Sequence, residues 1–254
     1  MKNFLRFCRN TFSQEENHRI AALSTFGRFL FGDYRFGWPQ IAWWGNKEFN
    51  DYLATFDELE GYNTHRKWML YQLLRLVEHV PGDTAECGVW RGASSYLICL
   101  ANDKNSQHRR VHYCFDSFEG LSTPGSEDGN HWQEGDLAAD EHVVENALAE
   151  FANVRLCKGW IPERFNEFND CRFAFIHVDV DLRDPTMHSI DFFYDRLNTG
   201  GIFLCDDYGC TTCPGATAAI DEFLENKPEQ MLALDNGGGF FIKGTAVANG
   251  ALNT

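Results

Sequence analysis

The sequence of 254 residues has no run of about 18 consecutive apolar residues, which is the shortest stretch that lets a helix cross a bilayer. Its first thirty residues also lack a charged region followed by an apolar segment and a small-residue cleavage site, so we expect no secretory signal and a cytoplasmic location. No internal repeat or low-complexity tract is present, and the fold is therefore sought in the alternation of strand and helix patterns.

Basic residues are few. The 22 Lys and Arg stand against 37 Asp and Glu, which gives a formal net charge of −15. A field of this sign repels phosphate backbones and anionic lipid headgroups, so we expect neither nucleic acid nor a membrane as partner. The surplus carboxylates either cover a solvated surface or gather in a cleft, where they hold a cation.

The cysteines do not indicate a disulfide scaffold. The nine cysteines are a small fraction of a chain of this length, and an odd count cannot pair completely within one chain. Several lie within apolar runs, as expected of reduced thiols in a cytoplasmic protein. Cys210 and Cys213 have a spacing that occurs in zinc and redox sites. They have no second pair and no His at finger spacing, which disfavours structural zinc.

Strand and helix patterns alternate from about residue 60. Helices are predicted at 64–78, 96–101, 138–151, 185–197 and 215–226. Strands are predicted at 84–89, 110–115, 154–157, 173–180 and 202–205, with a closing hairpin of 231–234 and 240–243. Residues 198–201 have the pattern of a helix C-cap. The alternation predicts an α/β fold with a mostly parallel sheet, helices on both faces and a C-terminal antiparallel hairpin.

The segment before the alternation is rich in aromatic residues. The stretch from Phe26 to Trp44 also contains Phe29, Phe31, Tyr34, Phe36, Trp38 and Trp43. We expect residues 1–60 to form a cap on the core or a subunit contact, with a pocket wall as the alternative, and we expect a homo-oligomer. Residues 61–244 are predicted to form the main domain and residues 245–254 a tail.

The turn after the first predicted strand is small and glycine-rich. Its glycines, Gly88 and Gly92, are four residues apart and do not match the fingerprint of a pyrophosphate loop. Glu86 at this strand end suits a cationic ligand group, such as an amino group or a sulfonium. Asp116 ends the second strand, where an acid commonly accepts both hydroxyls of a ribose. The two strand ends together indicate a nucleoside site without a phosphate clamp, as S-adenosylmethionine requires.

Four carboxylates follow two neighbouring strands. If the chain stays extended after the most apolar strand, Asp179 and Asp181 point to the same face, and Asp206 and Asp207 end the next strand. Four such groups repel one another unless a cation lies among them, and hard oxygen ligands suit Mg²⁺ or Ca²⁺. The alternative is that one or two of these acids, such as Asp207 or the nearby Asp184, cap the following helices.

A long polar segment at residues 121–137 separates the second strand from the next helix. Loops of this length in a compact domain are usually lids or disordered segments. His131 and Trp132 are candidates for contact with a sugar, whose apolar C–H face suits an aromatic ring. The alternative is a solvated loop without a role. His177, inside an apolar strand, is expected to face a packing layer and not the substrate.

Several motifs occur together in a characteristic order. They are Ala85-Glu86-Cys87-Gly88-Val89-Trp90-Arg91-Gly92, Ser94-Ser95, Phe115-Asp116-Ser117-Phe118-Glu119-Gly120-Leu121, Lys158-Gly159, His177-Val178-Asp179-Val180-Asp181-Leu182, Asp206-Asp207-Tyr208-Gly209, Pro214-Gly215-Ala216 and Asp221-Glu222-Phe223. Over residues 61–244 the chain thereby resembles the macrocin O-methyltransferase (TylF/MycF-like) family of sugar O-methyltransferases from bacterial natural-product pathways. The resemblance implies a Rossmann-like class I fold and methyl transfer from S-adenosylmethionine, dependent on Mg²⁺, to a hydroxyl of a deoxysugar on a glycosylated metabolite.

The resemblance also implies roles for individual residues. Asp179, Asp206 and Asp207 are expected to hold the metal, and Asp181 is expected to be the general base. The residues expected to bind the cofactor are Glu86, Cys87, Gly88, Ser94, Asp116 and Ser117.

The acceptor is the least defined part of this prediction. Arg183 and Tyr208, with His131 and Trp132, are the candidate substrate contacts. Two positions depart from the family pattern, because Val180 stands where Gly is common and Arg183 where Tyr is common. The alternatives are a metal-dependent O-methyltransferase for catechols or phenols, and a non-catalytic module that binds S-adenosylmethionine or a metal.

Overall fold

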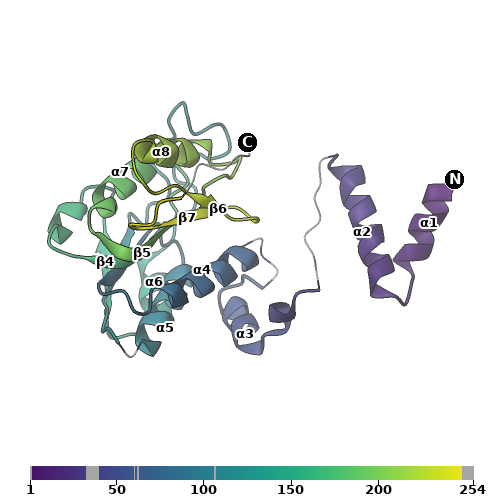
Figure 1. Cartoon of the computed structure of the whole chain (residues 1–254), viewed down its shortest axis with the longest axis horizontal. Coiled ribbons are helices and arrows are strands. Elements are labelled where there is room, and N and C mark those ends of the chain that lie inside the picture. The colour runs from purple at the N-terminus through teal and green to yellow at the C-terminus, as the bar shows by residue number, and fades with distance from the viewer. Residues whose placement is uncertain (1, 33–39, 60, 62, 106, 248–254) are drawn as a thin grey trace. The chain divides into compact units, whose positions relative to one another are not determined.

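The computed structural model describes residues 2–32, 40–59, 61, 63–105 and 107–247. The chain divides into two compact units, residues 1–55 and residues 56–254, which are described separately (Figure 1). Within the described residues, each helix is too short or too polar to cross a bilayer.

The N-terminal unit is helical. Its elements are α1 (Lys2–Thr11), α2 (Glu16–Leu30), the 3-10 helix η1 (Ala42–Gly45) and α3 (Lys47–Thr55). α1 and α2 form an antiparallel pair in which the rings of Phe7 and Phe26 stack with centroids 6.5 Å apart. Of the predicted aromatic stretch, Tyr34, Phe36 and Trp38 lie outside the described residues.

The second unit is built on a seven-stranded sheet with the order β3-β2-β1-β4-β5-β7-β6. The strands are β1 (Asp83–Cys87), β2 (His112–Asp116), β3 (Val154–Lys158), β4 (Phe173–Val178), β5 (Leu197–Cys205), β6 (Leu232–Ala233) and β7 (Gly239–Ile242). The first five in spatial order are parallel, and β7 is antiparallel to both β5 and β6. The predicted parallel sheet with a closing hairpin is confirmed.

Helices cover both faces of this sheet (Figure 1). They are α4 (Thr64–Leu76), α5 (Ala93–Lys104), α6 (Glu141–Ala147), the 3-10 helix η2 (Phe165–Phe168), α7 (Arg183–Tyr194) and α8 (Pro214–Leu224). The larger apolar core lies between the sheet and the pair α7 and α8, with Phe193 and Ile220 fully buried. A smaller core on the other face joins α5 and α6 through Cys99 and Val144.

The strand order reverses between β1 and β4. The chain runs from β1 outward to β2 and β3, and then returns to β4 on the other side of β1. Ligands of open parallel sheets bind beyond the carboxyl ends of the strands at such a switch point. The strand ends followed by Gly88, Asp179 and Asp206 lie at this place.

Two local predictions were wrong. β4 ends at Val178, and Asp181 has a left-handed backbone (φ 60°), so the chain is not extended from Asp179 to Asp181. Residues 198–201 belong to β5 and not to a helix cap, because the Gly200 N–H donates to the Lys243 carbonyl at 2.8 Å and the Lys243 N–H to the Gly201 carbonyl at 2.8 Å. Backbone pairing with the chain beyond β7 overrides the cap pattern.

Gly88 makes the close approach of β1 and β4 possible. Its φ is +81°, and a Cβ at this position would lie 1.8 Å from the carbonyl oxygen of Asp179. The Asp179 N–H donates to the Cys87 carbonyl at 2.9 Å, which holds the two strand ends together. The glycine predicted for ligand approach therefore also admits a neighbouring backbone.

We predict that Gly88→Ala lowers the free energy of unfolding by at least about 2 kcal/mol more than Gly135→Ala, because overpacking adds to the left-handed strain. Gly135 is the matched control, since its φ is +84° and nothing lies within 4 Å of the added Cβ. Urea unfolding of both variants measures the difference. Equal losses would show that the contact with Asp179 imposes no constraint.

Candidate functional site

A cavity of about 770 Å³ opens at the carboxyl ends of β1, β2, β4 and β5. All four predicted carboxylates line it, namely Asp179, Asp181, Asp206 and Asp207. The other lining residues used below are Arg66, Lys67, Glu86, Gly88, Ser94, Asp116, Ser117, His131, Trp132, Leu182 and Asp184. The topology thus brings together the strand-end residues that the sequence singled out.

The four carboxylates form two adjoining groups. Ligand atoms of His177, Asp179 and Asp206 lie within 4.8 Å of one another, and those of Asp181, Asp207 and Cys213 do so as well. The left-handed backbone at Asp181 directs its N–H to the Asp207 carboxylate, which accepts it at 2.8 Å. The hydrogen bond uses one oxygen of Asp207 to hold the turn after β4.

Burial and mutual repulsion govern the charge of the cluster. Burial, and then the charge of Asp206, raises the pKa of Asp179 to about 6. Burial, and then Asp179, raises the pKa of Asp181 to about 7, and burial with Asp181 raises the pKa of Asp207 well above its usual range. Asp206 is the exception: burial works to raise its pKa, but His177 and Arg66 hold it well below the usual value.

A cation from α4 compensates part of this charge. Nη1 of Arg66 lies 2.6 Å from the Asp206 carboxylate and also donates to the Asp206 carbonyl at 3.1 Å. The next residue, Lys67, is buried and lines the same cavity. The sequence analysis used only the apolar residues of this helix and missed both cations. The adjacent Arg-Lys pair in the first turn of this amphipathic helix was the available signal.

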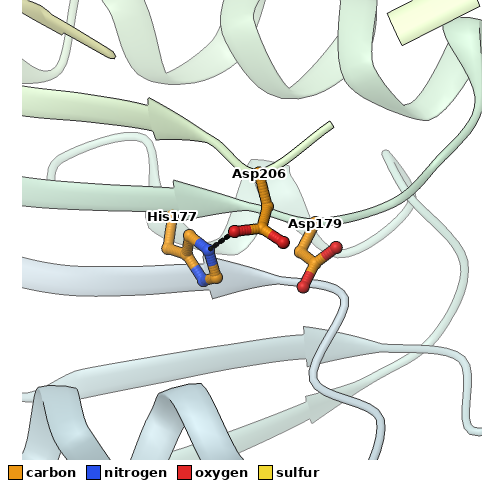
Figure 2. Close-up of side chains that lie close together, drawn as sticks. All are labelled: His177, Asp179 and Asp206. Carbon is orange, nitrogen blue, oxygen red and sulfur yellow. Dashed lines mark ion pairs between the residues drawn. The ribbon is translucent and has the colours of Figure 1, made fainter. Parts of the chain in front are cut away.

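His177 lies beneath the cluster, between two carboxylates. It is 1% exposed, its Nδ1 is 2.8 Å from Glu86, and its Nε2 is 3.7 Å from Asp206. Figure 2 shows the ring directed at Asp206, with the Asp179 carboxylate beside it. Burial works to lower the pKa of His177, but Asp206 and Glu86 raise it to about 10, so the imidazolium is paired on both sides.

This arrangement changes the expected role of Glu86. Its carboxylate faces the cavity wall but is 1% exposed, and it accepts a short hydrogen bond from Ser95 as well as facing His177. Burial works to raise its pKa, but His112 and His177 lower it to about 2. The charge of Glu86 is therefore already opposed by histidine within the protein, although Glu86 also lines the cavity.

The other predicted cofactor residues divide into two kinds. Asp116 accepts from the N–H groups of Val89 and Trp90 at 2.6 and 3.0 Å, so it fixes the glycine-rich turn as well as facing the cavity. Ser117 donates to the Gly120 carbonyl at 3.2 Å. Gly88 and Ser94 line the cavity. The Cys87 side chain is fully buried in the apolar core, because alternate residues of a strand point to opposite faces, and it is not available to a ligand there.

The loop at residues 121–137 is held in place. Asp128 is 4% exposed and accepts from the N–H groups of Arg183 at α7 and Gly125 in the loop, each at 2.7 Å. Trp132 donates its indole N–H to the Cys213 sulfur at 3.3 Å. The loop therefore contributes His131 and Trp132 to the cavity wall.

Two candidate substrate residues lie elsewhere. The Arg183 guanidinium pairs with Glu222 of α8 at 2.5 Å and with Glu127 at 3.0 Å. The Tyr208 hydroxyl donates to Asp221 at 2.7 Å. Neither residue is among the described residues that line the cavity, so the geometry gives no support to direct contact of either side chain with the acceptor. Acidic partners on the surface of α8 draw these side chains outward.

The donor atoms of the cluster fit a hard divalent cation. Most are carboxylate oxygens, which Mg²⁺ and Ca²⁺ prefer, and burial together with the neighbouring carboxylates raises the pKa of three of the four. Burial raises the pKa of the Cys213 thiol, so this group is a neutral neighbour and a poor ligand. Cys210 is not part of either group of ligand atoms among the described residues.

Comparison with known proteins gives a consistent result. The family model described as macrocin-O-methyltransferase (TylF) matches residues 70–243. An 8-demethyl-8-(2,3-dimethoxy-alpha-L-rhamnosyl)-tetracenomycin-C 4'-O-methyltransferase from Streptomyces olivaceus is 31% identical over 155 residues, which are 56% of this chain and 58% of the relative. A demethyldecarbamoylnovobiocin O-methyltransferase from Streptomyces niveus is 27% identical over 174 residues, 63% of this chain and 65% of the relative. The chain thus spans less than two thirds of either relative.

Solved structures agree. The O-methyltransferase NovP superposes with a TM-score of 0.57 at 26% identity. The match covers 70% of this chain and 79% of the NovP chain. A calicheamicin methyltransferase, CalS11, superposes with a TM-score of 0.65, and the match covers 92% of this chain and 95% of the CalS11 chain. Its identity is 18%, so it supports the fold alone.

The charge of Asp181 gives a prediction for stability. In the absence of divalent cations, its raised pKa of about 7 makes the folded state lose stability as the pH rises from about 4 to 7. Asp181→Asn removes this penalty and keeps an oxygen that can accept from Cys213. We expect the variant to gain on the order of 1–3 kcal/mol more at pH 8 than at pH 4.5.

Urea unfolding in EDTA at the two pH values measures this gain. Asp191→Asn on the exposed side of α7 is the matched control and is expected to show no such difference. An equal effect of Asp181→Asn at both pH values would contradict the raised pKa.

Proposed function

Because the chain belongs to the macrocin O-methyltransferase family, we propose that it transfers a methyl group from S-adenosylmethionine to a hydroxyl of a sugar on a glycosylated natural product. The observation that carries the proposal is the convergence of four carboxylates on one cavity beside a glycine turn and a strand-end acid. This combination provides a nucleoside subsite next to a site for a cation and a base.

Asp179, Asp206 and Asp207 are the proposed ligands of Mg²⁺. When bound, the ion supplies Lewis-acid activation, which lowers the pKa of a coordinated sugar hydroxyl. Arg66 holds the Asp206 carboxylate in place and keeps it ionised. The family assignment and the oxygen-rich donor set support the metal, and its identity as Mg²⁺ is part of the proposal.

Asp181 is the proposed general base. It lies in the cavity wall beside the proposed metal ligands, and a pKa of about 7 is close to the operating pH, where a base is most effective. Its backbone is fixed by Asp207, so the carboxylate is oriented before the acceptor binds. The cavity then positions the hydroxyl for in-line attack on the sulfonium methyl group.

The acceptor side of the cavity carries aromatic rings. His131 and Trp132 contact each other edge to face with centroids 4.7 Å apart. Such a surface suits the C–H face of a sugar, and the rhamnosyl group in the name of the relative from Streptomyces olivaceus supports this acceptor class. We propose these two residues, and neither Arg183 nor Tyr208, as the acceptor contacts.

We also propose that residues 1–60 form an association segment and that the enzyme works as a homo-oligomer in a reducing cytoplasm. Phe12 and Phe29 of the N-terminal unit are 85% and 81% exposed, which suits a subunit contact. All nine cysteines are free thiols, which supports the reducing compartment.

The acceptor class is tested with purified protein, methyl-labelled S-adenosylmethionine, Mg²⁺ and a panel of glycosides and catechols. We expect label in the glycosides, because an aromatic wall beside the carboxylates suits the C–H face of a sugar. Label confined to catechols would overturn the sugar assignment. Binding of S-adenosylmethionine without transfer to any panel member would favour a non-catalytic module.

Two isosteric variants distinguish the role of the general base from that of the metal ligands. We expect Asp181→Asn to lower kcat by about 10²–10⁴-fold, as loss of a general base does, while Mg²⁺ still raises the melting temperature. Asp179→Asn is expected to weaken that stabilisation by Mg²⁺ as well as turnover. Full activity of Asp181→Asn would rule out its role as base, and methyl transfer unchanged by EDTA would rule out the metal.

A further inference from the structure

Lys67 is a buried cation at the wall of the cavity. It lies on α4, is 6% exposed, and donates from Nζ to the Ser94 hydroxyl at 2.5 Å. Lys is almost never buried to this extent without a partner of opposite charge. The side chain therefore requires an explanation that packing does not give.

Among the residues that the structure describes, no carboxylate lies within 4.0 Å of Lys67 Nζ. Arg66 differs, because it forms an ion pair with Asp206 at 2.6 Å. The charge of Lys67 reaches the cluster from a longer distance, where it lowers the pKa of Asp179 and Asp206. A desolvated ammonium group without a contacting anion is unfavourable, and an anionic group of a ligand in the cavity would satisfy it.

The surroundings of Lys67 favour an anion at this point. Ser94 is in the first turn of α5, a helix that begins after the left-handed Gly92 and has no side-chain N-cap. The first N–H groups of a helix and its dipole attract negative charge. The buried Lys67, the Ser94 hydroxyl and the start of α5 thus meet at one part of the cavity wall.

We infer that Lys67, together with Ser94, binds the carboxylate of the amino-acid part of the methyl donor. The inference rests on the proposed function and concerns the donor carboxylate, a group opposite in charge to the amino group or sulfonium for which Glu86 was considered. A single carboxylate matches the one ammonium group and the one hydroxyl that meet there, whereas the diphosphate of a sugar nucleotide carries at least two negative charges and would lie in a cavity lined by four carboxylates.

The test compares two ligands by isothermal titration calorimetry: S-adenosylhomocysteine and its decarboxylated analogue, which keeps the amino group. We expect Lys67→Met to weaken the binding of S-adenosylhomocysteine by about 10- to 100-fold, the usual effect of losing a charged hydrogen bond. The dissociation constant of the analogue is expected to change by less than about threefold, since the analogue lacks the group that Lys67 binds. Ser94→Ala is expected to cause a smaller loss with the same selectivity.

Arg75→Met is the matched control, because Arg75 is on the same helix but exposed, and both ligands are expected to bind it as they bind the wild type. If Lys67→Met does not fold, Ser94→Ala carries the same comparison. Equal losses of affinity for both ligands, or no loss of affinity for either, would overturn the role of Lys67. Failure of the wild-type protein to bind either adenosyl ligand would instead overturn the proposed function.

Discussion

Four carboxylates at the ends of β4 and β5 repel one another in a partly desolvated cavity, and much of the local structure serves to oppose this repulsion. Arg66 contacts Asp206 directly, and His177 lies beneath the same carboxylate with Glu86 on its other side. Asp207 is engaged by a backbone N–H. These contacts leave Asp179, Asp181 and Asp207 with raised pKa values, so the residual repulsion is concentrated where the proposed cation binds.

The backbone around the cluster is shaped by the same need. Asp181 adopts a left-handed conformation that turns its N–H toward Asp207, and the turn leads directly into α7. Asp128 from the distant loop accepts the N–H of Arg183 at the start of that helix. A Cβ at Gly215 would lie 2.1 Å from an Asp128 oxygen, so α8 needs a glycine at this contact. The acidic turn, the loop and two helices are therefore interdependent.

The fold was predictable because its signals are local and periodic. The apolar run of β4 and the amphipathic pattern of α4 identified their elements, the antiparallel hairpin was confirmed, and the motif resemblance identified the family. The carboxylates were predictable because strand ends of a parallel sheet converge. The partners of Glu86 and Arg183 were not predictable, because a charged side chain pairs with whatever opposite charge the tertiary structure brings near. Arg66 and Lys67 were missed for the same reason, since helical periodicity reports apolar contacts only.

Charge balance connects the cluster to the acidic composition of the chain. Glu86 and the imidazolium of His177 offset each other, and Arg66 and Lys67 place two positive charges near the four aspartates. A bound divalent cation would favour ionisation of the aspartates whose pKa values are raised, and it would offset the two negative charges that remain once all four are ionised. If Lys67 contacts the donor carboxylate, the sulfonium and amino group that arrive with it supply positive charge to the same cavity. Most of the remaining surplus behind the net charge of −15 is then a property of the surface and not of the site.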